Sequence, residues 1–406
     1  MTSTIAWLDF SEEDQQRARK ILSLFSQPGS VDELGIGTVR DALSDAMFRG
    51  TSVLQTRARY LLFIPWLFHE AKRLGRSGSE LQRWVDRHER QLIEALRQGG
   101  AGGVGEGLIG RVAGERLKIL PSAIYWTALQ SFGILRRRWT MEQVAAAAEG
   151  AFGAGDTLTE LVDRVDTVWD PGLPSPPQGF FQLEEASFSL TRHEADWLAE
   201  RIEASVPGTL LAWLVACEVL PSHDGAAPWE EPSVVGAPSQ IQRVVGHARL
   251  FSAALHGAAL LYNLLVAERF RDRGLDQKGE RVSEYSRALQ KWASDLDGLP
   301  EIVNWQVSDF WEVVTAENMR IPPLTRSFVE KWIAIARSGD RHAVADSSSA
   351  RQLVTGRERQ LKGGRSRLAN DRLLGEWTGA SGAGRLTFRW DQVKVLLGDI
   401  VEGRST

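Results

Sequence analysis

Cysteine is nearly absent from the sequence, since Cys217 is the only one among 406 residues. A single thiol cannot form an intramolecular disulfide or a cysteine-rich zinc site, and low cysteine usage is typical of a reducing cytoplasm. Cys217 lies in the mainly apolar segment LVACEVL, which indicates a buried side chain and not a nucleophile. The first residues, MTSTIAWLDFSEED, lack the basic and apolar regions of a signal peptide, so we expect a cytoplasmic protein.

Long hydrophobic runs are also scarce. Residues 250–267 carry no formal charge and reach the lower length limit of a membrane helix, which is about 17 residues. They also contain the polar residues Ser252, His256 and Asn263, together with several small residues that allow close helix packing. The sequence therefore predicts a buried core helix here and no contact with a membrane.

Motifs of known catalytic sites are missing as well. The sequence has no phosphate-binding loop of the ATPase type and no serine-nucleophile elbow, and its histidines are scattered. His193-Glu194 lacks the second histidine of a zinc protease, and GEGLIG (105–110) follows a helical pattern where a dinucleotide site needs a strand. We expect no metal and no cofactor. One enzymatic alternative stays open, a divergent Mg²⁺-dependent nuclease using Asp391, although the start of a helix explains this residue better.

Arginine, in contrast, is abundant. The chain has 40 arginines and 8 lysines, yet its net charge is −4 because acidic residues outnumber the cations. The cations gather in residues 111–138 and 351–372, whereas the charged residues of 156–200 are mainly acidic. Such segregation is typical of a polyanion-binding surface, and also of ordinary solvated faces.

The hydrophobic periodicity predicts a mainly α fold. The proline-rich segment 170–179 cannot be helical, because proline lacks the backbone donor and restricts the residue before it. We expect a multi-helical, two-lobed protein with an N-terminal helical domain (1–154), an acidic and proline-rich linker (155–190) and a C-terminal helical domain (191–406). A few short strands are expected, one of them at 385–390 before a final helix. Further helices are expected at 11–26, 32–48, 54–74, 78–98, 191–205, 207–218, 238–270, 276–297, 305–317, 323–337 and 365–376.

Residues 105–140 have the order of a winged helix-turn-helix. The pattern predicts a helix at 107–118, a second helix that starts at Pro121 and stops at Gly133, and a basic strand at 134–139. In a winged helix the second helix enters the major groove and the wing contacts phosphates. We therefore expect the side chains of the second helix to face DNA and the cations around it to neutralise backbone phosphates; the alternative is a structural or protein-binding winged helix. The residues expected to face DNA are Tyr125, Thr127 and Gln130, and the cations are Arg116, Lys118, Arg136, Arg137 and Arg138.

A second candidate DNA contact is the basic stretch 356–372, which follows a segment, DSSSA, of flexible composition. It is interpreted either as a loop that orders on a phosphate backbone or as a solvated helix surface or partner-docking segment. The residues proposed for contact are Arg357, Arg359, Lys362, Arg365 and Arg367.

Four separated blocks of the chain resemble an uncharacterised bacterial family of unknown function. The blocks appear in order as WLDF (7–10), DELGIGTVRDALSDAMFRGTSVLQTRARYLLFIPW (32–66), GLIGRVAGERLKILPSAIYW (107–126) and the tail that begins at RSRLANDRLLGEW. The resemblance covers essentially the whole chain and supplies no catalytic residues. It implies a place in anti-phage defence gene clusters, beside helicases and nucleases.

The hypothesis that follows is a non-catalytic DNA-binding or scaffolding subunit of a bacterial anti-phage defence complex, with a helicase or nuclease as partner. A pure protein-interaction module is the competing class, with tryptophan-rich faces and the acidic residues 156–200 as docking surfaces. The divergent nuclease is the third.

Overall fold

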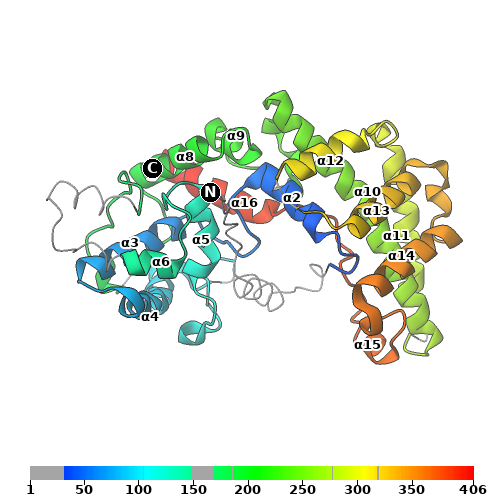
Figure 1. Ribbon diagram of the computed structural model, residues 1–406, viewed down its shortest axis with the longest axis horizontal. Helices are drawn as coiled ribbons and strands as arrows, with labels where there is room; N and C mark the ends of the chain where they lie inside the picture. Colours follow the sequence, from blue (N-terminus) through cyan, green and yellow to red (C-terminus); the bar gives the residue numbers. More distant parts are fainter. Residues whose placement is uncertain are drawn as a thin grey trace, which may run out of the picture. The chain divides into compact units, whose positions relative to one another are not determined.

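The computed structural model describes residues 32–103, 105–147, 168–184, 186–222, 224–276, 278–317 and 320–406. It is mainly helical, which confirms the mainly α part of the predicted fold class (Figure 1). Among these residues the only β-pairing is an isolated antiparallel bridge between Leu135 and Trp169. The helix expected at 11–26 lies outside the described residues, as do residues 155–167 of the expected linker.

The chain divides into two compact units, each assembled from segments that are distant in sequence. Unit 1 contains the described residues up to Arg40 and His247–Leu386, and unit 2 contains Asp41–Gly246 and Thr387–Thr406. The expected division at 155–190 is not where the structure divides. The described part of that segment belongs to unit 2, where Trp66 Nε1 donates a hydrogen bond to the Pro174 carbonyl (2.6 Å).

Unit 1 is a bundle of helices arranged on one long apolar helix, α10. Its helices are most of α10 (Ser239–Asp272), α11 (Glu280–Asp297), α12 (Val307–Ala316), α13 (Pro323–Arg337), α14 (Ser348–Lys362) and α15 (Asp371–Gly375). Gly257 of α10 lets Trp292 lie against the helix backbone, because a Cβ at this position would be 2.3 Å from the indole ring. The indoles of Trp292 and Trp332 donate to the carbonyls of Ala253 and Ala254, both at 2.8 Å.

By length and composition α10 is the one helix of the described chain that could cross a membrane, yet 89% of its most apolar window is buried inside the protein. Its polar residues have structural partners. Ser252 donates to the Leu386 carbonyl (2.9 Å), His256 Nε2 contacts the Ala383 carbonyl (3.1 Å), and Asn263 exchanges two 2.8 Å bonds with the backbone of Ser381. The strand predicted at 385–390 is wrong, because Phe388 and Arg389 have positive φ values and no strand pairs with this segment among the described residues.

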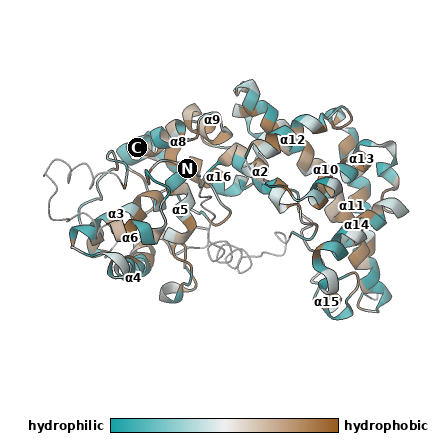
Figure 2. Cartoon of the chain, viewed as in Figure 1, coloured by the Kyte–Doolittle hydropathy of each residue, from teal (hydrophilic) through white to brown (hydrophobic). Residues whose placement is uncertain are grey.

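Unit 2 surrounds an aromatic core. Its long helices are amphipathic, as buried helix faces require, and Figure 2 shows hydrophobic and hydrophilic residues mixed along them. Tyr60, Phe63 and Trp66 of α3 pack on Phe180 and Phe188, with ring centroids 5.1–6.4 Å apart. The helices of unit 2 are α2 (Gly37–Phe48, from Asp41 onward), α3 (Tyr60–Arg73), α4 (Gly78–Leu96), α5 (Pro121–Ser131), α6 (Met141–Ala147), α8 (Arg192–Ser205), α9 (Leu210–Cys217) and α16 (Trp390–Ser405).

The C-terminal helix α16 is tied into unit 2 by a buried ion pair. Asp399 accepts hydrogen bonds from Arg57 Nε (2.9 and 3.0 Å) and from the Ala58 amide (2.7 Å). Burial raises the pKa of Asp399, and the bonds from Arg57 and Ala58 oppose that shift. A second buried pair joins Arg59 to Glu194 of α8 at 2.9 Å. These two ion pairs therefore join segments of unit 2 that are distant in the sequence.

A buried carboxyl group caps the N-terminus of α5. Both oxygens of Glu89, from α4, accept bonds from Ser122, one from its amide (2.7 Å) and one from its hydroxyl (2.8 Å). Burial raises the pKa of Glu89 to about 7, despite these two bonds. The folded protein thus holds a proton on Glu89 over a pH range in which the unfolded chain has lost it.

We expect Glu89→Gln to flatten the pH dependence of stability. A carboxyl pKa that is raised on folding stabilises the protein most below the unfolded value, near 4.5, and this contribution is lost as the pH rises through about 7. Between about pH 5 and about pH 8 the wild type should lose roughly 2 kcal/mol of unfolding free energy relative to the variant. Urea denaturation of both proteins at the two pH values measures this, and parallel profiles would contradict it.

Candidate nucleic-acid interface

Three consecutive arginines occupy a short turn after α5, which we call the arginine turn (residues 136–139). Its first residue is held to a distant segment, since the Arg136 amide donates to the Val168 carbonyl (2.9 Å). The Asp170 amide donates in turn to the Ile134 carbonyl (2.9 Å). The basic strand predicted at 134–139 is therefore reduced to the single bridge between Leu135 and Trp169.

Beyond the bridge the backbone reverses in a three-residue turn. The Trp139 amide donates to the Arg137 carbonyl at 2.8 Å, and φ of Arg138 is not positive, so the turn is an inverse γ-turn with Arg138 at its apex. The Trp139 carbonyl accepts two further bonds from α5, one from Trp126 Nε1 (2.7 Å) and one from Gln130 Nε2 (2.9 Å).

The side chains of Arg136, Arg137 and Arg138 are exposed, and no carboxylate of the described residues forms an ion pair with them. The guanidinium of Arg137 lies 5.0 Å from the centroid of the Trp139 ring, a cation–π contact that leaves its charge uncompensated. Some exposed arginines elsewhere are paired, as Arg73 is with Glu70. The turn is thus a local excess of positive charge on a fixed backbone.

The segment before α5 adds exposed cations but is not the predicted helix. Residues 107–118 form turns and one short 3-10 helix, η2 (Gly114–Arg116). Gly107, Gly110 and Gly114 have φ values of 81°, 85° and 53°, which interrupt a right-handed helix. The helix expected at 107–118 is therefore wrong, whereas α5 begins at Pro121 as predicted. Arg111, Arg116 and Lys118 are exposed and form no ion pair within the described part of the chain.

Most of the α5 residues expected to face DNA instead form hydrogen bonds within the protein. Tyr125 is fully buried; its hydroxyl accepts from the amides of Thr56 (2.8 Å) and Arg57 (3.0 Å) and donates to the Arg57 carbonyl (2.8 Å). The prediction for Tyr125 is thus wrong. Gln130 is half-buried and its amide group bonds the arginine turn, so only Thr127 is exposed as predicted. The expected base-reading face is not present on α5.

The second basic stretch is mostly internal to unit 1. Arg357 of α14 is buried, and its guanidinium donates to the carbonyls of Leu34 (2.8 Å) and Gly35 (3.0 Å) and to the Thr325 hydroxyl (2.7 Å). Lys362 and Arg367 both pair with the buried carboxylate of Glu33. Arg357 is buried and therefore not available to DNA as predicted, whereas Lys362 and Arg367 are half-buried and already paired, so their contact with DNA stays a prediction.

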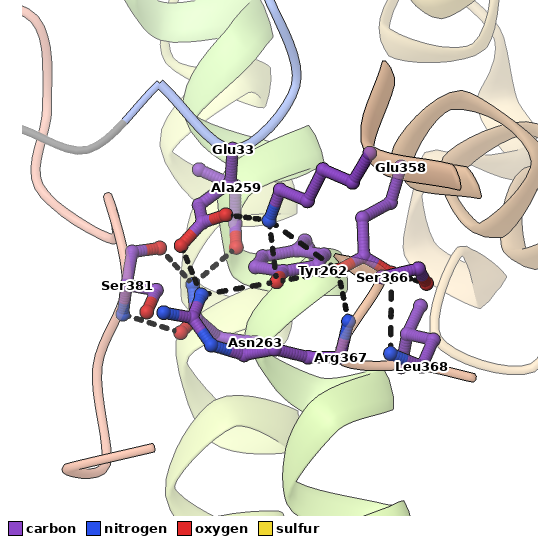
Figure 3. A network of polar contacts seen from close by, with 10 residues as sticks. Glu33, Ala259, Tyr262, Asn263, Glu358, Ser366, Arg367, Leu368 and Ser381 are labelled. Carbon is purple, nitrogen blue, oxygen red and sulfur yellow. Dashed lines mark hydrogen bonds and ion pairs between the residues drawn. The ribbon is translucent and has the colours of Figure 1, made fainter. Parts of the chain in front are cut away.

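Figure 3 shows the network that holds this stretch. The carboxylate of Glu358 is fully buried and accepts bonds from the Ser366 hydroxyl and from the amides of Arg367 (2.8 Å) and Leu368 (3.2 Å). Burial opposes ionisation, but these bonds and the nearby Lys362 outweigh it and lower the pKa of Glu358.

Two cations of the second stretch do remain outside the network. Arg359 and Arg365 are exposed and form no ion pair with any described residue. Their flanking segment is α14, a regular helix, where the composition indicated a flexible loop.

The nuclease alternative receives no support from the geometry. Asp391 lies in the first turn of α16, with Lys394 at 3.5 Å, and no group of three metal-binding side chains occurs among the described residues. The strand expected before Asp391 is absent from this described segment, since Phe388 and Arg389 have φ values of 53° and 67°.

A family model described as "Family of unknown function (DUF6361)" matches residues 2–403. The chain belongs to this family. The sequence resemblance to an uncharacterised family is thereby confirmed, over nearly the whole chain. Comparisons with curated proteins and with solved structures gave no match. Membership in this family of unknown function assigns no role to any residue, so the geometry above carries the functional argument.

We expect Glu33→Ala to destabilise unit 1, because it removes the carboxylate that Lys362 and Arg367 share and leaves only Glu358 beside Lys362. Removing one partner of a buried pair costs about 3–5 kcal/mol; since both cations are partly exposed, we expect about 2 kcal/mol in urea unfolding. Glu376→Ala is the matched control, as it removes an acid from an exposed pair with Arg372, and should cost less than about 0.5 kcal/mol. Equal effects of the two substitutions would contradict the structural role of Glu33.

Proposed function

We propose that this protein is a non-catalytic nucleic-acid-binding subunit, and that the arginine turn contacts the phosphate backbone of DNA. The observation that carries the proposal is the display of Arg136, Arg137 and Arg138 on a fixed turn with no carboxylate partner in the described residues. Planar guanidinium groups bind phosphate oxygens in a bidentate manner. Arg111, Arg116 and Lys118, just before α5, extend the same excess of positive charge along the chain.

The binding we propose does not depend on base sequence. Base readout needs amide or hydroxyl groups free to reach a groove edge, whereas affinity for phosphates needs only cations. Tyr125 is buried and Gln130 bonds the Trp139 carbonyl, so α5 offers Thr127 as its exposed hydroxyl. A winged-helix arrangement with a recognition helix is therefore not part of the proposal.

A partner enzyme is the second component of the proposal. The support for it is the resemblance to a family placed beside helicases and nucleases in defence clusters, together with a sequence in which we find no nucleotide-hydrolysing motif. A subunit of this kind would deliver DNA to a partner, and anti-phage defence is the setting we propose.

The competing role, docking of proteins on tryptophan-rich faces, has less to support it. Every tryptophan in the described residues is buried or half-buried, which is typical of helix packing. The apolar residues that are most exposed in unit 2 are valines, Val112 at 88% and Val235 at 83%, and they lie on separate segments.

Replacing Arg136, Arg137 and Arg138 together by alanine should weaken binding to DNA and reduce its salt dependence. Each lost phosphate contact lowers the slope of log affinity against log salt by about 0.9 on duplex DNA, so the slope should fall by up to about 2.7. Fluorescence anisotropy with a short labelled duplex over a series of salt concentrations measures both quantities.

The matched control replaces three exposed arginines outside both basic stretches, Arg192, Arg287 and Arg326, by alanine. It changes the net charge by the same amount and should leave the slope unchanged. An equal fall in both variants, or no salt-sensitive affinity in the wild type, would overturn the proposed function.

A further inference from the structure

The exit of the arginine turn is held through one backbone oxygen, that of Trp139. The Trp139 carbonyl accepts hydrogen bonds from Trp126 Nε1 (2.7 Å) and Gln130 Nε2 (2.9 Å), two residues that lie one helical turn apart on α5. A carbonyl oxygen has two lone pairs, so these two donors saturate it. Because Trp139 also closes the γ-turn through its amide, the last residue of the turn is fixed through both of its peptide groups.

The donor Trp126 is itself immobilised by aromatic packing. Its ring lies 5.4 Å from Phe68 and 6.0 Å from Trp169, and those two rings are 5.7 Å apart. Trp169 also forms the bridge with Leu135, where the chain enters the turn. One aromatic cluster therefore fixes both the entry to the turn and its exit.

The residues after the turn are anchored as well. The Thr140 amide donates to Gln143 Oε1 (2.9 Å), and the Gln143 amide donates to the Thr140 hydroxyl (3.2 Å), a reciprocal cap at the start of α6. Between these fixed backbone segments, the side chains of Arg136, Arg137 and Arg138 are exposed to solvent. Long side chains lose less entropy on binding when the backbone that carries them is already ordered.

We infer that Trp126 and Gln130 are positioning residues for phosphate binding, which hold the three guanidinium groups in the arrangement that meets a nucleic-acid backbone. This inference rests on the proposed function and assigns to Gln130 a role different from base recognition. Neither residue touches the ligand. Each acts through the Trp139 carbonyl, so its loss weakens binding while the number of charges is unchanged.

The test uses Gln130→Met in the full chain, which keeps the size of the side chain and removes the donor. We expect the dissociation constant for a short labelled DNA duplex to rise about tenfold, since the turn must then be ordered at the moment of binding. The salt slope should stay at the wild-type value, because all phosphate contacts still form in the complex. Hydrogen exchange of the Trp139 amide should become faster in the free protein.

Gln242→Met is the matched control. Gln242 of unit 2 also donates from its side chain to backbone carbonyls, those of Val235 (2.9 Å) and Ala237 (2.7 Å), away from the arginine turn. Its affinity for the duplex should equal that of the wild type. Trp126→Phe, which removes the other donor and keeps an aromatic ring, should repeat the effect of Gln130→Met.

The outcomes separate the two proposals. If the triple arginine variant loses affinity but Gln130→Met and Trp126→Phe bind as Gln242→Met does, the positioning role is overturned and the proposed function survives. If the triple arginine variant binds duplex DNA as the wild type does, the proposed function itself is overturned. A reduced salt slope in Gln130→Met would also contradict the inference, because it would mean that phosphate contacts are lost.

Discussion

The free-energy cost of a buried charge determines which cations of this chain are available to a ligand. A carboxylate that leaves water must be compensated by cations or by hydrogen-bond donors. Glu33 pairs with Lys362 and Arg367, Asp399 pairs with Arg57, and Glu194 pairs with Arg59. Cations that pair with buried carboxylates in this way are less available at the protein surface. The arginine turn is distinguished by the opposite condition, since within the described chain no acidic side chain pairs with it.

The local sequence was sufficient to predict the structure at positions where neighbouring residues alone determine the backbone conformation. The start of α5 at Pro121 follows from the fixed φ of proline, and its end follows from Gly133, whose φ is 68°. The apolar length of α10 predicted a core helix, and 89% of its most apolar window is buried. The helix expected at 107–118 failed for an equally local reason, because three glycines with positive φ break it. That signal was present in the sequence but was outweighed by the apolar spacing.

Partners that are distant in sequence account for the other errors. Nothing near residue 362 indicates that Lys362 pairs with Glu33, and nothing near Tyr125 indicates that its hydroxyl bonds the backbone of Thr56 and Arg57. A helical pattern shows which residues share a face, but it does not show whether that face meets solvent or protein. Trp126 and Gln130 are four residues apart and so share a face, a signal that could have indicated joint action. Their shared acceptor, the Trp139 carbonyl, is visible only in three dimensions.

An acidic protein that binds an acidic polymer needs short-range contacts of good geometry. With a net charge of −4 the chain as a whole does not attract DNA from a distance, and at physiological salt charges interact over only about 8 Å. Under the proposed function, affinity comes from the few cations that contact phosphates, and each ordering cost at that site reduces it directly. A turn whose backbone is bonded at its entry, across its apex and at its exit lowers this cost. The same argument explains why the second basic stretch is the weaker candidate, because three of its five candidate cations, Arg357, Lys362 and Arg367, already contact oxygens of the protein.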